Sequence, residues 1–273
     1  ATCLAVLPLT GVGFWLLSVS ERELLGRLER EQAAVATSVA DATGAVLLTA
    51  VNALATSAGL FDWAALSPAE VEGGLKLLYA QSKIVAGVGY VDPKTPDAPV
   101  PVVGGLEEHP PFDVATGAER LRADAPLEFL SKHGDRGQVG VAAALLGTGD
   151  RPVLPVAIQV GRGERSPFIV AELGLDPVEE ALLRRAQAGA RLELVDGEGR
   201  VVASSAAGRG LVALEPELRD AIGKGVGTAG ALRIASAPVT GLAGFHVVVS
   251  VPESVALAPV RALRQTVLVG TGA

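Results

Sequence analysis

The chain has 273 residues, a length that suits one large domain or two small domains, each able to bury a core of its own. Its net charge is -7 and its arginines lie singly or in pairs among acidic residues, which argues against a nucleic-acid-binding protein. The single cysteine, Cys3, excludes an intrachain disulfide and a metal site built from several cysteines.

Residues 1–18 contain no charged side chain and end close to the apolar run Trp15-Leu16-Leu17. A membrane-spanning helix needs about 20 apolar residues, so we interpret residues 1–18 as a membrane helix that lacks its beginning. A cleaved signal peptide is the alternative, although its apolar region is usually shorter and ends in small residues. Because the chain has no methionine, not even at position 1, we expect it to be an internal part of a longer protein.

Apolar residues recur at close to helical spacing after this segment, for example at Leu24, Leu28, Val35 and Val39. The pattern predicts a long amphipathic helix over residues 19–62. This helix can simply pack against the domain that follows, and it can also serve as a stalk that dimerises and carries a signal. The two roles are compatible.

Residues 63–175 predict a first α+β module. Ser67-Pro68 followed by Glu70 is typical of a helix start, and this helix is expected to reach about Gln81. A short helix is expected at about residues 118–129. Five strands are expected around a proline-rich turn and this mixed region, at 84–92, 102–105, 138–146, 151–160 and 167–175.

A linking helix is predicted over residues 176–189, with Asp176 at its cap and Pro177 at its first position. Residues 190–252 predict a second module. It has a hairpin that turns at 196–199, a short helix and two further strands. An exit helix and the start of a second membrane helix are expected over residues 253–273.

Motifs for cofactors and catalysis are weak. The sequence GVGTAG at residues 225–230 matches a dinucleotide fingerprint, but a helix precedes it and a strand follows, the reverse of the required context. We therefore expect no cofactor. His109, His133 and His246 are far apart and lack metal-ligand spacing, so we expect neither a metal site nor a catalytic triad. The chain is not expected to be an enzyme.

A ligand pocket needs only apolar walls and a few polar groups. Aromatic residues make up just 4% of the chain, so those of the first module, together with nearby charged residues, are the best candidates. The candidate ligand-binding residues are Trp63, Tyr79, Tyr90, Asp92, Arg120, Arg122 and Arg151, with Phe61 beside Trp63 at the start of the module.

The order of elements over residues 19 to about 262 resembles the double Cache sensor domain, in which two PAS-like modules follow a long membrane-emergent helix. RLELVDGEGRVVASS, residues 191–205, is similar to the family's strand-turn-strand with an Asp-x-x-Gly turn. FIVAELGLDPVEEAL, residues 168–182, resembles the strand and helix that leave the distal module. The resemblance implies an α+β fold with two PAS-like antiparallel sheets in series on a long N-terminal helix.

Members of this family are input domains of chemoreceptors, histidine kinases and related receptors, and usually bind a small molecule in the distal module. The resemblance therefore implies an extracytoplasmic sensor, anchored in a bacterial inner membrane and homodimeric, that binds a small molecule. An amino-acid-binding subgroup carries Trp-Tyr and Tyr-x-Asp motifs that residues 118–150 lack, so we do not expect amino-acid binding. An anionic ligand, an apolar ligand or none stays open. A ligand-free structural or partner-binding module is the alternative function.

Overall fold

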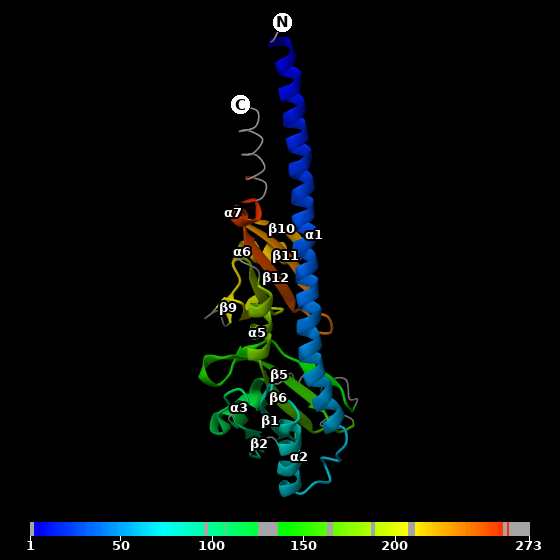
Figure 1. Ribbon diagram of the computed structural model, residues 1–273. Coiled ribbons are helices and arrows are strands. Elements are labelled where there is room, and N and C mark those ends of the chain that lie inside the picture. Colours follow the sequence, from blue (N-terminus) through cyan, green and yellow to red (C-terminus); the bar gives the residue numbers. More distant parts are fainter. Residues whose placement is uncertain are drawn as a thin grey trace.

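The computed structural model describes residues 3–95, 98–106, 108–124, 136–162, 166–186, 189–206, 211–258 and 261, and side chains from residue 18 onward except those of residues 21 and 221. These residues form one long helix and two antiparallel sheets of six strands each. Figure 1 shows the sheets one after the other along the helix. The expected α+β fold with two sheets in series is confirmed.

The long helix, α1 (Cys3–Ala58), is continuous across the predicted boundary at residue 18. Its buried face consists of small and branched apolar residues such as Ala36, Val39, Leu47 and Leu54, which pack against both sheets. The helix ends at Ala58, a few residues before the predicted end. The chain then turns toward α2.

Among the described residues, α1 is the one helix long and apolar enough to cross a membrane. An 18-residue stretch within Ser18–Ala58 is apolar enough, with a mean hydropathy of 1.6, and 44% of this stretch is buried inside the protein. Packing on the sheets therefore accounts for much of its apolar character. The predicted membrane segment at residues 1–18 lies almost entirely outside the described side chains and stays a prediction.

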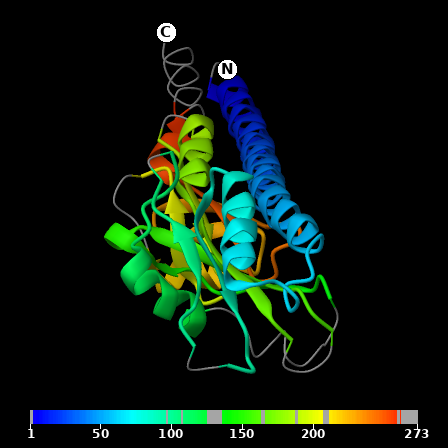
Figure 2. The ribbon, with the colours of Figure 1, turned by 90° about the horizontal axis from the view of Figure 1, so that it is seen from below.

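The first sheet has the strand order β2-β1-β6-β5-β3, with β4 paired to β5. Helices α2 and α1 lie beside each other on one face, and α3 covers the other face (Figure 2). The elements are α2 (Pro68–Ala80), β1 (Val85–Val91), β2 (Val102–Gly104), α3 (Val114–Asp124), β3 (Val139–Val141), β4 (Leu145–Leu146), the 3-10 turn η1 (Thr148–Asp150), β5 (Pro152–Gln159) and β6 (Phe168–Gly174).

Two expectations for this module are wrong in detail. The helix predicted at 118–129 begins earlier, at Val114, because the Asp113 carboxylate accepts hydrogen bonds from Ala115 N (3.0 Å) and Thr116 Oγ1 (2.9 Å). Residues 125–129 of the prediction lie outside the described residues. The strand predicted at 138–146 is split into β3 and β4, and the break starts opposite Pro155, which has no N–H to donate to the ladder.

The second sheet has the strand order β10-β11-β12-β7-β8-β9. Four of its strands match the predicted ones, while β9 and β10 are short strands that the sequence pattern did not indicate. Helix α5 (Asp176–Arg185) links the two sheets, and its first helical residue is Asp176 rather than Pro177. The elements are β7 (Arg191–Val195), β8 (Arg200–Ser204), β9 (Val212–Ala213), α6 (Pro216–Ile222), β10 (Val226–Ala229), β11 (Leu232–Pro238), β12 (His246–Pro252) and α7 (Glu253–Ala256).

The first sheet lies far from the beginning of α1, whereas the second sheet and α7 lie nearer to it (Figure 1). All strands of the first sheet fall within residues 63–175 and those of the second within residues 190–252. The module boundaries themselves stay a prediction. The start of a second membrane helix, expected at residues 266–273, lies outside the described part of the chain.

Candidate functional site

A cavity of about 290 Å³ lies beside the first sheet, between the start of α2 and the loop that follows β1. Its volume is at the lower end of the range for small-molecule sites, roughly 300–1,000 Å³. Four of the seven predicted ligand-binding residues line it. The lining residues are Trp63, Ala64, Leu66, Pro68, Val71, Tyr90, Val91, Asp92, Thr95, Ala98, Pro99, Val100, Pro101 and Arg122.

Stacked aromatic rings form one wall of this cavity. The rings of Trp63 and Tyr90 stack at 5.8 Å between centroids, and Phe61 meets Trp63 edge-on at 5.4 Å. The indole Nε1 of Trp63 donates a hydrogen bond to the Ala58 carbonyl (2.7 Å), at the last residue of α1. Helix α2 approaches closely because Gly74 faces the indole, where an added Cβ would lie 2.9 Å from Trp63 Cη2. The wall is therefore fixed to two helices.

A cation and an anion also border the cavity. The Nη2 of Arg122 donates to the Ala98 carbonyl, and its Nε is buried without a hydrogen-bond partner. A buried donor without a partner costs free energy, roughly 1–3 kcal/mol, that an acceptor from a ligand can recover. Asp92 accepts a hydrogen bond from Lys94 N at Oδ1 (2.9 Å), which orients its carboxylate at the start of the loop.

The hydroxyl of Tyr90 stays protonated over a wide pH range. Burial, and then the negative charge of Asp92, raise the pKa of Tyr90 to about 12. At neutral pH the group is therefore a neutral hydrogen-bond donor and acceptor within the aromatic wall.

The other three candidates lie outside the lining of this cavity, and each has a partner of its own. Tyr79 is buried, stacks on His109 at 4.0 Å and accepts a hydrogen bond from Leu106 N (3.2 Å) at its hydroxyl. Burial raises the pKa of Tyr79. These contacts hold the loop before α3 against α2.

Arg120 and Arg151 both form ion pairs. Arg120 donates from Nε and Nη2 to the two carboxylate oxygens of Glu172 (2.5 and 2.9 Å), under α3, where Glu172 is 1% exposed. Arg151 pairs with Asp176 at the start of α5 (3.0 Å) on the surface. Ligand binding by these residues stays a prediction that their positions do not favour.

Sequence reasoning missed the loop residues that close the cavity, among them Thr95, Pro99 and Pro101. The signal for them is the proline-rich run directly after Asp92, a pattern that predicts a turn and does not by itself indicate a cavity wall. Prolines hold such a loop in few conformations, which suits a preformed wall.

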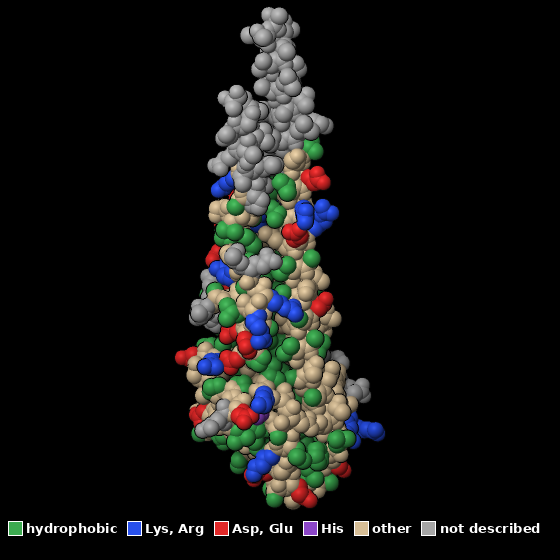
Figure 3. Space-filling view, viewed as in Figure 1, with side chains coloured by type: hydrophobic (Ala, Val, Ile, Leu, Met, Phe, Trp, Pro, Cys, Tyr) green, Lys and Arg blue, Asp and Glu red, His purple; other side chains and the backbone are tan. Residues whose placement is uncertain are grey.

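Among the residues that the structure describes, no group of three or more His, Cys, Asp and Glu side chains could hold a metal ion. On the face drawn in Figure 3, acidic and basic side chains alternate without a field of one sign.

No protein-family model matches the chain, and no curated protein matches its sequence. Its structure is similar to solved sensor domains. The ligand-binding domain of the Pseudomonas fluorescens chemoreceptor CtaA, in complex with L-isoleucine, has a TM-score of 0.64 at 13% identity, over 88% of this chain and 98% of that chain. The periplasmic sensory domain of the Campylobacter jejuni chemoreceptor Tlp1 has a TM-score of 0.61 at 14% identity, over 86% and 99%.

The extracellular domain of the putative histidine kinase soHK1S-Z6 is also similar, with a TM-score of 0.57 at 20% identity, over 87% of this chain and 98% of that chain. Together these matches define the fold as that of the tandem PAS-like sensor domains. These neighbours are sensor domains of the double Cache type, and the overlap extends over almost the whole length of each of them.

Proposed function

We propose that this chain is the extracytoplasmic sensing part of a membrane-anchored signalling receptor and that its ligand is a small molecule bound in the cavity beside Trp63 and Tyr90. Two observations support the proposal. The fold is shared with ligand-binding domains of chemoreceptors and of putative histidine kinases, which are sensor domains rather than enzymes. The cavity carries the proposal further, since it joins an aromatic wall to a guanidinium with a buried, unpartnered N–H.

The lining favours a small carboxylic acid with an apolar body. A carboxylate is the natural acceptor for the free Nε of Arg122, because hydrogen bonds between charged groups are about twice as strong as neutral ones. The apolar body would lie against the apolar lining of the cavity, such as Leu66, Val71 and Val100. Asp92 would repel a second negative charge, so a monocarboxylate fits better than a dicarboxylate.

The contact between Trp63 and the end of α1 suggests how ligand binding changes the position of this helix. Trp63 touches the cavity and also holds the last carbonyl of α1 at Ala58. A ligand that contacts Trp63 therefore favours some positions of the helix end over others. It shifts the population only by the difference in its affinity for those positions, so a tight but indifferent ligand would not signal.

The first experiment is a thermal-shift screen of the purified chain against monocarboxylic acids, dicarboxylic acids, amines, purines and amino acids. A ligand at about 100 times its dissociation constant stabilises the protein by roughly 2.7 kcal/mol. Titration calorimetry then compares the wild type with Arg122→Gln and Tyr90→Phe, using Arg151→Gln as a matched surface control. We expect the first two to weaken binding and the control to leave it unchanged. If no compound in the screen raises the melting temperature of a folded sample, the proposal is contradicted.

We also propose the finer assignments implied by the resemblance: a bacterial inner-membrane location, a homodimer and a ligand site in the module remote from the membrane. Light scattering of the chain in detergent across a range of concentrations tests the dimer. Labelling of introduced surface cysteines in intact cells and in spheroplasts with an impermeant reagent tests the location.

A further inference from the structure

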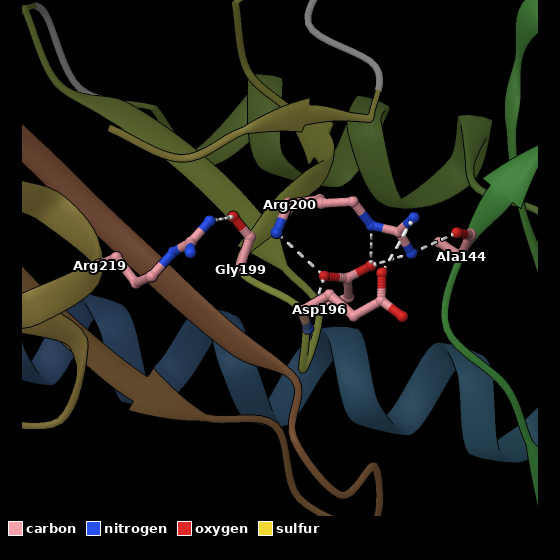
Figure 4. Close-up of polar contacts among 6 residues, drawn as sticks. Ala144, Asp196, Gly199, Arg200 and Arg219 are labelled. Carbon is pink, nitrogen blue, oxygen red and sulfur yellow. Dashed lines mark hydrogen bonds and ion pairs between the residues drawn. The ribbon is translucent and has the colours of Figure 1, made fainter. Parts of the chain in front are cut away.

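The turn between β7 and β8 is built around one buried carboxylate. Asp196 is 2% exposed, and its Oδ1 accepts hydrogen bonds from the backbone N–H groups of Glu198 (3.0 Å) and Arg200 (2.9 Å). Its Oδ2 accepts from Nε (2.9 Å) and Nη2 (2.7 Å) of the Arg200 side chain. Figure 4 shows this arrangement. The same carboxylate therefore fixes the turn and the guanidinium.

The turn is also held within its own module. Gly199 has φ +74°, and an added Cβ would lie 2.6 Å from Nε of Arg219 on α6. The Gly199 carbonyl accepts hydrogen bonds from Leu214 N (2.9 Å) and from Arg219 Nη2 (3.4 Å). A displacement of the turn would consequently also displace Arg219 of α6 and Leu214, which directly follows β9.

Arg200 extends beyond its module. Its Nη2 donates a hydrogen bond to the Ala144 carbonyl (2.7 Å) in the first-sheet region. Ala144 is 1% exposed and lies in the interruption between β3 and β4, where the ladder with β5 is broken opposite Pro155. The break in one sheet thus leaves a backbone carbonyl for the arginine of the other (Figure 4).

We propose that Arg200 is a coupling residue that makes the β3–β4 segment of the first sheet and the Asp196–Gly199 turn of the second sheet move together. The contact is direct and partly buried, and it requires no ligand. It therefore goes beyond the proposed sensing function and stands or falls separately from it. A shift of the Ala144 carbonyl moves the guanidinium, and Asp196 passes that shift to the turn because it holds both groups.

Hydrogen exchange followed by mass spectrometry on the purified full chain tests the coupling. Arg200→Gln is compared with Arg219→Gln, which removes a contact to the same turn but touches nothing described in the first sheet. We expect Arg200→Gln to speed exchange at least tenfold in peptides covering both 139–147 and 192–204, because loss of one charge-assisted hydrogen bond changes an opening equilibrium by roughly 10- to 100-fold. Arg219→Gln should speed exchange only within the second module.

Faster exchange confined to the second module in Arg200→Gln would overturn the proposal. If this variant does not fold, Arg200→Lys is the second test, because its ammonium group can pair with Asp196 but cannot hold Asp196 and the Ala144 carbonyl in the same geometry. We expect faster exchange at 139–147 with a smaller change at the turn. Wild-type exchange at 139–147 in this variant would likewise overturn the coupling.

Discussion

The ion pair between Arg120 and Glu172 gives the sharpest prediction for stability. The Glu172 side chain is 1% exposed and that of Arg120 is 17% exposed, and two hydrogen bonds join them. Arg120 also lies over the Phe112 ring, 5.6 Å from its centroid. Replacement of Arg120 with Met leaves a buried carboxylate without its cation, and breaking such a pair costs about 3–5 kcal/mol.

Urea denaturation followed by tryptophan fluorescence measures this cost. The chain has two tryptophans, so in a Trp15→Phe background the signal comes from Trp63, which lies in the first module. We expect the midpoint to fall for Arg120→Met while the slope with urea stays the same, as for a pure change in stability.

Two further variants make the reasoning refutable. The double variant Arg120→Met, Glu172→Met should recover most of the loss, because an apolar pair of similar volume often replaces a buried ion pair at little cost. Arg151→Met breaks the exposed pair with Asp176 and should cost less than about 1 kcal/mol. A cost below 1 kcal/mol for Arg120→Met, or a double variant no better than the single one, would refute the argument.

Three other predictions follow from packing and burial. Gly117→Ala should destabilise by about 1–3 kcal/mol in urea despite the better helix propensity of Ala, because its Cβ would lie 2.2 Å from Phe112 Cζ; Phe112→Leu should relieve the loss. Gly199→Ala should lower the melting temperature, since φ +74° strains an alanine. Absorbance at 295 nm should show little tyrosinate in the folded chain at pH 10, because Tyr79 and Tyr90 have raised pKa values. Unfolding at the same pH should raise the absorbance, because an unfolded tyrosine with a pKa of about 10 is roughly half ionised there.

The sign of the tyrosine effect on stability follows from the direction of the shift. The native state holds the Tyr90 proton more strongly than the unfolded chain, whose tyrosine pKa is about 10. Its contribution to stability is therefore fully present below pH 10 and is lost as the pH rises through about 12. Stability in Tyr90→Phe should fall less over that interval, and an equal fall in both proteins would contradict the assignment.

Local signals predicted most of the fold. The helical spacing of α1, the alternation around Asp196 and the Ser67-Pro68 start of α2 are all set by residues within one turn or one hairpin. The sequence could not indicate β9 or β10, because strands of two and four residues are too short to show a period and are held only by pairing with β8 and β11. The predicted start of α3 is four residues late, because the hydrogen bonds from Ala115 and Thr116 to Asp113 that begin the helix appear only in the structure.

The site was only partly predictable for a related reason. Residue type suggested seven candidates, but whether a side chain faces a cavity or a partner depends on contacts between distant segments. Glu172 pairs with Arg120 across 52 positions of sequence, and no local pattern indicates this. Trp63 and Tyr90 stack because α2 folds back on β1, which likewise appears only in three dimensions.

Because α1 is continuous, the residues that line the cavity and the residues that contact the beginning of the helix lie at separate places along one rigid element. Between Glu29, which pairs with Arg233 of β11, and Ala58, which holds Trp63, the helix contains no proline and spans roughly 45 Å. A displacement of one end of such a helix moves the other end, whatever the chemical nature of the ligand that causes it. Under the proposed function, substitutions in the loop after β1 and at the start of α2 can therefore change the ligand specificity. They require no change in α1 or in the second sheet.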